Sequence, residues 1–466
     1  MTNNHSTKSS QRRLDITTKE IGPQMVRLTL PMLYALVAIM GLGVVDSYFI
    51  SFLGTNELAA IGFIAPVTQI VTNFGLGLGM AISSIISKLI GAKKNDQAAQ
   101  IVTNGFYLTA GLALITVVVL VWQLEPVFNL IGASKSTMPA ILSYMNVWVF
   151  AIPAVMFSMV CSSTFRAIGD TKTSAVIAIS MTLSNLILDP ILIFGWGPFP
   201  ELGIAGAGLA TLIAVLISLV IAVYHLYFRE KLLLLALPKW HDFKLNTSEL
   251  LEVAIPAVLA NSIVPITAAV LTAIVAFLGT DAVAGYGVGA RIEALMLIMV
   301  YALSSTLPMF IGQNLGAKKY TRVRRAIRLS FRFSLIFQLA LYIMVALLAK
   351  SIAIQFSDQE SVQETIVLYL WVVPIAFGLS GIVTLINVSM NVLGKPRIAL
   401  YINIIRLTFL YIPFAYLGSQ MFGLKGFYIG IVVSHCFAYL IAMIYLKRVL
   451  KGLNITKQTN TALSTL

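Results

Sequence analysis

Acidic side chains are rare inside the apolar segments of this 466-residue chain. Asp46 lies in the stretch GLGVVDSYFISFLGT, at the end of an apolar run that begins near Val26. Asp189 lies in SNLILDPILIFGWG and Glu293 in GVGARIEALMLI, whereas the other fifteen acids fall in loops, tails or segment ends. A carboxylate in hydrocarbon costs about 2.5–3.5 kcal/mol on insertion scales. These three acids are therefore candidates for binding an ion or a substrate.

Four polar side chains are expected to meet in one cluster. Asn185 and Asp189 are four residues apart and share a helix face. Asp46 lies about 10 Å below the outer end of its segment, at ~1.5 Å per residue, and Asp189 and Thr211 reach a similar depth. Two neighbouring carboxylates in a low dielectric do not both stay ionised unless a proton or Na⁺ neutralises the pair. The cluster is predicted to bind one of these ions; hydrogen bonding to the backbone at a kink next to Pro190 is the structural alternative.

Arg291 and Glu293 form a second candidate, as a substrate contact or a structural polar lock. Residues two apart do not face one another on a helix, so neighbouring helices are alternative partners for both charges. Arg406 lies some nine residues from a segment end and is given a packing role with a snorkelling head group. His435 is expected to be a hydrogen-bonded residue at a helix contact, with a proton-relay role as the alternative.

The composition indicates an integral membrane protein. Hydrophobic residues make up 58% of the chain, charged residues only 11%, and the mean hydropathy is +0.90; a soluble domain has about 25% charged residues. The first apolar run is too long for a signal peptide and is expected to stay as a spanning helix. The two cysteines, Cys161 and Cys436, lie in apolar segments and suggest neither a disulfide framework nor a metal site.

Twelve apolar runs are long enough to cross a membrane. Alternating the loops between the two sides places 27 of the 32 Lys and Arg residues on one side, which the positive-inside rule assigns to the cytoplasm together with both termini. The net charge of +14 is thereby explained by topology, so no nucleic-acid partner is expected. The runs are residues 24–53, 58–90, 101–123, 138–165, 174–196, 203–228, 250–278, 283–314, 326–349, 361–392, 398–421 and 425–447.

The two halves of the chain form an internal repeat at an offset of 225 residues. FLGT at 52–55 recurs at 277–280, and GAKK at 91–94 recurs at 316–319. Each half holds six spans and begins on the same side, as in transporters built from two parallel repeats. The predicted fold is an all-α membrane protein of two six-helix bundles. The predicted parts are an N-terminal cytoplasmic tail (1–23), the first bundle (24–228), a cytoplasmic linker (229–249), the second bundle (250–447) and a C-terminal tail (448–466).

The first and seventh spans carry prolines at matching positions of the repeat. Pro31 lies fifteen residues before Asp46, and a proline inside a helix removes a backbone hydrogen bond and permits bending. Pro31 is therefore a candidate hinge that responds to the charge on Asp46. Pro256 at the equivalent position favours the alternative of a plain structural kink.

With these motifs in hand, the chain resembles the multidrug and toxic compound extrusion (MATE) transporters over about residues 20–450. The resemblance is based on Pro31 and Asp46, FLGT, GAKK, FRAIGDTK, NLILDP and GIAGAGLAT. It implies two bundles facing a central cavity, with the cation site at Asp46, Asn185, Asp189 and Thr211. NorM-like members carry a glutamate in the seventh span, where this chain reads PAVLANSIVP without one. The DinF-like branch, with coupling in the first bundle, is the nearer likeness.

The resulting prediction is an antiporter of the inner cell membrane that exports lipophilic or cationic drugs in exchange for Na⁺ or H⁺. Its expected partners are small organic cations, the coupling ion and the lipid bilayer; we expect a monomer without a cofactor or enzymatic activity. No GxxxxGK[ST] motif is present, so an ion gradient is the expected energy source. A flippase for lipid-linked substrates and a membrane receptor or scaffold without a transport cycle are the alternatives.

Overall fold

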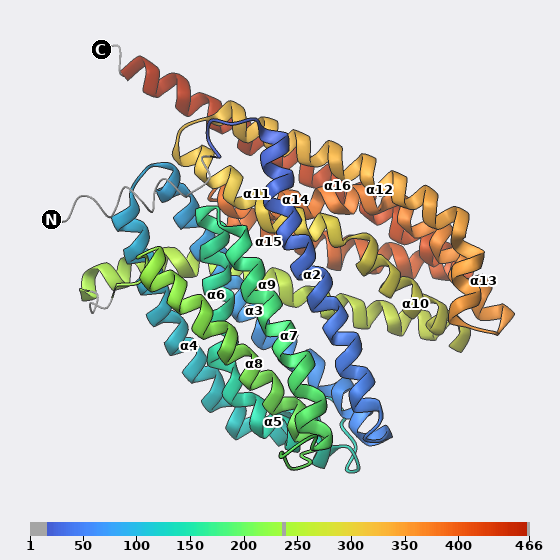
Figure 1. Ribbon diagram of the computed structural model, residues 1–466. Helices are drawn as coiled ribbons and strands as arrows, with labels where there is room; N and C mark the ends of the chain where they lie inside the picture. The colour runs from blue at the N-terminus through green and yellow to red at the C-terminus, as the bar shows by residue number, and fades with distance from the viewer. Residues whose placement is uncertain (1–15, 235–238, 464–466) are drawn as a thin grey trace. The chain divides into compact units, whose positions relative to one another are not determined.

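The computed structural model describes residues 16–234 and 239–463, and every regular element in these ranges is a helix (Figure 1). The first part contains α2 (Ile21–Ser51), α3 (Thr55–Gly91), α4 (Asn95–Leu130), α5 (Met138–Trp148), η1 (Val149–Ala151), α6 (Ile152–Ile168), α7 (Thr171–Phe194), α8 (Ile204–Tyr224) and η2 (His225–Arg229). The second contains α9 (Trp240–Ala276), α10 (Thr280–Met296), α11 (Ile298–Gly316), α12 (Tyr320–Phe356), α13 (Glu360–Val372), η3 (Val373–Ala376), α14 (Phe377–Val392), α15 (Pro396–Ile404), η4 (Ile405–Tyr411) and α16 (Ile412–Leu463).

Among the described residues, ten helical stretches are long and apolar enough to cross a membrane, and the bent pair α10–α11 makes an eleventh. The last stretch, Pro396–Gly452, would be about 85 Å long at 1.5 Å per residue, far more than a bilayer needs. Its helix geometry breaks at Phe422 and Gly423. Gly418 packs against the carbonyl of Gly426, and Gly430 against that of Phe414, so the chain reverses here. Counted as two spans, this hairpin gives the twelve that the sequence predicts.

The chain forms two compact units, which we call the first and second bundles. Of the described residues, the first comprises 16–19 and Val26–Val258, and the second comprises Glu20–Met25 and Leu259 onward. Both the boundary helix α9 and the first helix α2 therefore contribute to two units. The unit boundary within α9 lies beyond the polar stretch 229–249 that the sequence analysis takes as the linker.

The repeat is visible in the backbone as well as in the sequence. Gly54 and Gly279 both begin a helix with positive φ, at 143° and 117°. At the other ends of the matching segments, the GAKK residues Lys93 and Lys318 have φ of 61° and 58°, a left-handed conformation that is uncommon without glycine. Equivalent residues thus make the same turns in each half. The two six-span halves therefore have the same local architecture.

Close helix packing in the first bundle depends on glycine. A Cβ at Gly206 of α8 would collide with the carbonyl of Leu192 on α7, and one at Gly79 of α3 would collide with Ser163 on α6. Small residues allow helix backbones to approach in this way, which is the usual basis of helix association in a membrane. This contact aligns α7 with α8, the two helices that carry Asp189 and Thr211.

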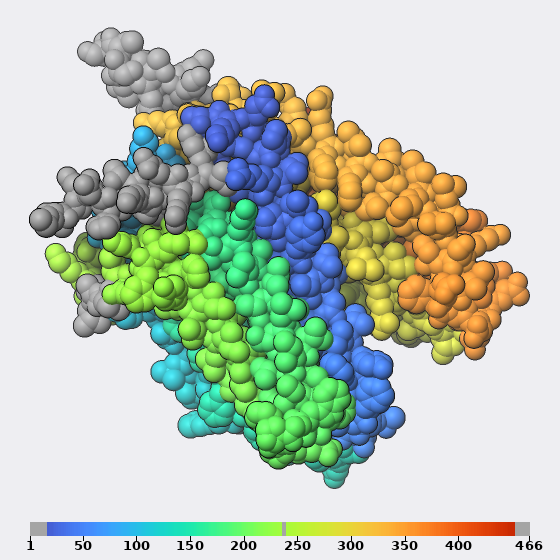
Figure 2. All heavy atoms as spheres, in the orientation of Figure 1, coloured from blue at the N-terminus to red at the C-terminus, as the bar shows by residue number. Residues whose placement is uncertain are grey.

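The helices expose apolar side chains as expected of a protein surrounded by lipid. Along α12, Ile336 is 69% exposed and Leu347 is 81% exposed. The side chains of this orange helix form a long strip on the surface of the second bundle (Figure 2). Apolar side chains exposed to this degree along one helix fit a hydrocarbon environment.

Candidate functional site

Asp189 is the most deeply buried acid of the candidate site, with a relative exposure of 1%. One turn earlier on α7, the amide of Asn185 donates a hydrogen bond of 2.7 Å to Oδ1 of Asp189. The spacing of four residues places both side chains on one face of the helix, as the sequence predicts. The second carboxyl oxygen, Oδ2, is buried and has no hydrogen-bond partner within the described chain.

Asp46 of α2 faces Asp189 within the first bundle. The two carboxyl groups lie close enough to share a hydrogen-bonded proton. Oδ1 of Asp46 is likewise buried and has no partner among the described residues. The structure therefore brings together two acids that are 143 positions apart in the sequence and leaves one oxygen of each available to a ligand.

Thr211 joins the cluster through a tyrosine that the sequence analysis does not single out. Its hydroxyl donates to the carbonyl of Ala207 at 3.1 Å, and the phenol of Tyr144 on α5 lies near it. Tyr144 is within electrostatic range of both Asp46 and Asp189. One signal in the sequence points to it, because the 225-residue offset aligns Tyr144 with Tyr369.

An apolar layer closes one side of this cluster. Ile50, Ile193 and Ala207 form a buried group one turn beyond Asp46, Asp189 and Thr211 respectively. A ring contact between Phe49 and Phe194, with centroids 6.2 Å apart, adds to the layer. Burial on this side keeps the local dielectric low and strengthens the interaction between the carboxylates and any bound cation.

The chemistry of the first-bundle site is that of oxygen ligands. The described residues contain no group of three or more His, Cys, Asp or Glu side chains placed to hold a metal ion. The site instead presents carboxyl, amide and hydroxyl oxygens, the ligands that hard cations prefer. A proton shared between the two carboxyl groups would satisfy the same arrangement.

In the second bundle, Glu293 and Arg291 do not share an environment. An oxygen of Glu293 accepts a 2.6 Å hydrogen bond from the phenol of Tyr369 on α13, whereas Arg291 is exposed. Glu293 is within electrostatic range of Arg406, whose guanidinium donates to the hydroxyl of Ser380 at 2.8 Å. The positively charged group nearest in effect to Glu293 is therefore Arg406 on η4. Arg406 has an electrostatic role beside Glu293 in addition to the predicted packing role.

Two further residues singled out in the sequence are Pro31 and His435. Pro31 lies inside the continuous helix α2, fifteen residues before Asp46. His435 is 2% exposed, and neither ring nitrogen has a partner in the part of the chain that the structure describes. The expectation that His435 is hydrogen-bonded is therefore wrong.

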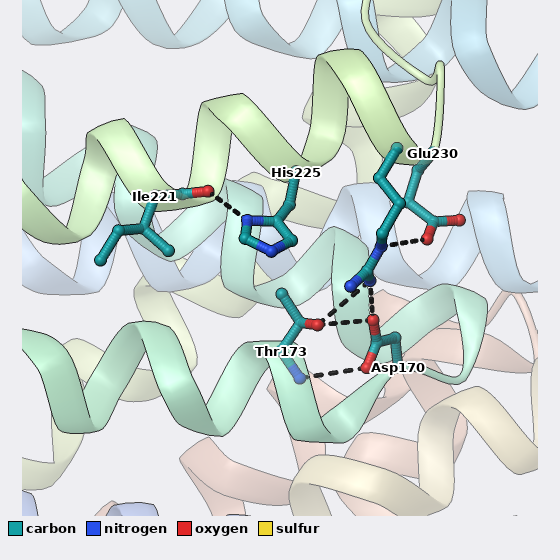
Figure 3. Close-up of polar contacts among 6 residues, drawn as sticks. Asp170, Thr173, Ile221, His225 and Glu230 are labelled. Carbon is teal, nitrogen blue, oxygen red and sulfur yellow. Dashed lines mark hydrogen bonds and ion pairs between the residues drawn. The ribbon is translucent and has the colours of Figure 1, made fainter.

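A separate polar cluster joins the start of α7 to η2, the segment that follows α8 (Figure 3). Asp170 accepts a hydrogen bond of 3.0 Å from the backbone amide of Thr173 and caps α7. Arg229 forms an ion pair with Asp170 and donates to Glu230 at 2.9 Å. His225 contacts the carbonyl of Ile221 in the same region. We call this cluster the clasp and interpret it as a structural link between the two segments, because Arg229 is already paired with both Asp170 and Glu230.

Comparison with known proteins agrees with the repeat. A family model described as MatE matches residues 31–191 and 256–417. The matches begin 225 residues apart, which is the offset of the repeat found in the sequence.

Three relatives cover nearly the whole chain. A protein of Shewanella oneidensis named FAD transporter is 36% identical over 423 residues, covering 91% of this chain and 94% of the relative. The multidrug export protein MepA of Staphylococcus aureus is 25% identical over 427 residues, covering 91% and 93%. The crystal structure of the Vibrio cholerae MATE transporter VcmN in its bent form has a TM-score of 0.88 and 30% identity, covering 96% and 99%. The chain belongs to the MATE family of membrane transporters.

Proposed function

We propose that this protein is a cation-coupled antiporter that exports small organic compounds, including lipophilic and cationic drugs. The observation that supports this proposal best is the carboxyl pair Asp46–Asp189, with an unpartnered oxygen on each side chain in the described structure. Buried ionisable groups inside membrane segments are costly and typically mark ion pathways. Coupling through the first bundle also fits the DinF-like branch.

The coupling step follows from the same residues. A Na⁺ ion or a proton would neutralise the pair, with Asn185 orienting Asp189 and with Thr211 and Tyr144 nearby. Binding of an ion to residues on α2, α5, α7 and α8 would change the packing of these helices. A ligand shifts a conformational equilibrium only by its differential affinity for the two states, so the ion must favour one state and the exported compound the other.

The orientation in the membrane completes the proposal. The excess of Lys and Arg on one side supports a cytoplasmic location of both termini and of the linker, with the protein in the inner cell membrane. Export then runs from the side rich in basic residues to the side on which Lys135, Lys350 and Lys425 lie.

The test uses purified protein in liposomes that contain a fluorescent lipophilic cation. A Na⁺ gradient and a pH gradient are imposed separately, with Asp46→Asn as the comparison variant. Efflux driven by one gradient and lost in the variant is expected and identifies the ion. Efflux under neither gradient would contradict the antiporter and favour the lipid-flippase alternative, whereas normal efflux in Asp46→Asn would remove Asp46 from the mechanism.

A second candidate function is export of flavin nucleotides. It is favoured by the 36% identity to the Shewanella oneidensis protein named FAD transporter, compared with 25% to MepA. Replacing the dye in the same liposomes with FAD tests it. Gradient-driven loss of FAD from the liposomes is expected, and retention of FAD under conditions that release the dye would exclude this substrate.

A further inference from the structure

The second bundle contains a polar cluster that the coupling mechanism does not use. We define the Arg406 cluster as Glu293 (α10), Tyr301 (α11), Tyr369 (α13), Ser380 (α14), Arg406 and Tyr411 (η4) and His435 (α16). Six separate helical elements contribute to it. In the repeat alignment Arg406 matches Met181 and Glu293 matches Thr68, so the first bundle has no equivalent charges at these positions.

Arg406 has donor capacity that the protein does not use. Its guanidinium makes a hydrogen bond to Ser380, while its Nε is buried and has no partner in the described structure. No carboxylate among the described residues lies within ion-pairing distance of it. A guanidinium carries five N–H donors and does not lose its charge in a protein. A partly buried arginine whose Nε is buried without a partner has a strong preference for an anion.

Arg406 lies in a segment with an unusual backbone conformation. Residues Ile405–Tyr411 form a π-helix, which is rare and often found at functional sites. In an α-helix, residues five apart point about 140° away from each other, at 3.6 residues per turn. The wider π-helical turn brings Arg406 and Tyr411 to one face, and the two are within electrostatic range.

The neighbours of Arg406 define what kind of anion would bind. Tyr301, which is 41% exposed, and Tyr411 both lie within electrostatic range of the guanidinium. The ring of His435 lies 5.2 Å from that of Tyr411 and offers two unpartnered nitrogens within the described chain. Aromatic faces favour planar rings, and an arginine fork matches the oxygens of a phosphate or carboxylate.

We propose that Arg406, Tyr301 and Tyr411 form a binding subsite for a phosphorylated, planar aromatic substrate, with the phosphate on the arginine. This inference builds on the second candidate function and assigns flavin nucleotides a site in the second bundle. Glu293 is held by Tyr369 and leaves the guanidinium available. The opposing interpretation is that Arg406 is only the electrostatic partner of Glu293 in a polar lock.

The test compares riboflavin with FMN, which differ by a single phosphate. Binding to purified protein in phosphatidylcholine nanodiscs is measured by flavin fluorescence. The wild-type protein is expected to bind FMN about 10- to 100-fold more tightly than riboflavin, the range for a charge-assisted hydrogen bond. Arg406→Gln is expected to bring this ratio close to one without weakening riboflavin, and Arg406→Lys to give an intermediate ratio, because lysine keeps the charge but loses the fork.

A control variant, the two Arg406 variants and a second lipid composition together decide whether Arg406 binds the phosphate of FMN. Arg328→Gln removes an exposed arginine of α12 and is expected to leave the FMN-to-riboflavin ratio unchanged. An unchanged ratio in folded Arg406→Gln and Arg406→Lys, or no FMN binding to the wild type, would overturn the proposal. Loss of the FMN preference in nanodiscs that contain phosphatidylglycerol would also overturn it, by assigning the subsite to a lipid phosphate.

The outcome is separable from that of the coupling site. Asp46→Asn is expected to retain the FMN preference at equilibrium even though it loses gradient-driven efflux. If the dye is exported normally while FMN shows no preference, the antiporter proposal stands and the phosphate subsite is excluded. If the FMN preference is present but no gradient drives efflux, the subsite stands and the antiporter proposal fails.

Discussion

The two carboxylates of the first bundle are predicted to bind one ion together, so removing either should weaken ion binding by a similar amount. A carboxylate about 4 Å from a cation contributes ~4 kcal/mol at an effective dielectric of ~20. Asparagine keeps a carbonyl oxygen as a ligand and recovers part of that energy. At about 1.4 kcal/mol per tenfold, we expect Asp46→Asn and Asp189→Asn each to bind the ion about 100-fold more weakly.

Thermal unfolding measures this loss directly. A ligand that binds the native state stabilises it by RT ln(1 + [L]/Kd), about 2.7 kcal/mol at 100 times Kd. A 100-fold weaker site at the same concentration retains only ~0.4 kcal/mol of that stabilisation. Unfolding of the detergent-solubilised protein is followed in NaCl with choline chloride keeping the ionic strength constant, and then across a pH series for a proton.

The matched control is Asp281→Asn, which replaces an exposed aspartate in the first turn of α10. It is expected to keep the full ion-dependent stabilisation of the wild type. Loss of the effect in only one of Asp46→Asn and Asp189→Asn would show that the two acids do not share a ligand. Equal stabilisation in all three variants would assign the pair a structural role.

Three further predictions concern helix packing, the tyrosine of the site and the clasp. Gly206→Ala places a methyl group against a backbone carbonyl and is expected to destabilise the protein by about 1–3 kcal/mol, whereas Gly111→Ala, which meets open space, should be neutral or stabilising in thermal unfolding. Tyr144→Phe removes the phenol hydroxyl next to Thr211 and is expected to raise the half-saturating ion concentration about 3- to 10-fold in the liposome assay. Asp170→Ala removes both a helix cap and an ion pair and should lower stability by ~1–2 kcal/mol, more than Arg229→Gln, which loses only partly exposed pairings.

The sequence predicts the fold well because the membrane imposes simple rules. Twelve apolar runs and a 225-residue repeat are sufficient for two six-span bundles, since only closed backbone hydrogen bonding is possible in lipid. The repeat also predicts equivalent helix ends. In both copies of GAKK the helix is followed by a left-handed residue, Lys93 in the first half and Lys318 in the second. The unit boundary is not predicted, because α9 runs without interruption from Trp240 to Ala276 through polar and apolar sequence alike.

The candidate site was only partly accessible to sequence reasoning. Asp46 and Asp189 are conspicuous because charge inside an apolar run is costly, and Asn185 follows from helical spacing. Tyr144 is not conspicuous, because an aromatic residue in an apolar segment is usually a packing residue. The surroundings of Arg406 depend on a π-helix and on neighbours from other helices, and neither can be read from local periodicity.

The 225-residue repeat relates positions of the two bundles that differ in charge within one architecture. Tyr144 and Tyr369 are equivalent by the 225-residue offset, and each phenol lies beside an acidic site in its own bundle. The acids themselves are not equivalent: Asp46 matches Leu271, which is buried, and Glu293 matches Thr68. An uncompensated carboxyl pair attracts a cation, whereas an arginine beside a single glutamate leaves a positive group available to an anion. The same tyrosine scaffold therefore supports opposite charge preferences, which separates the proposed coupling ion from the proposed phosphate of the substrate.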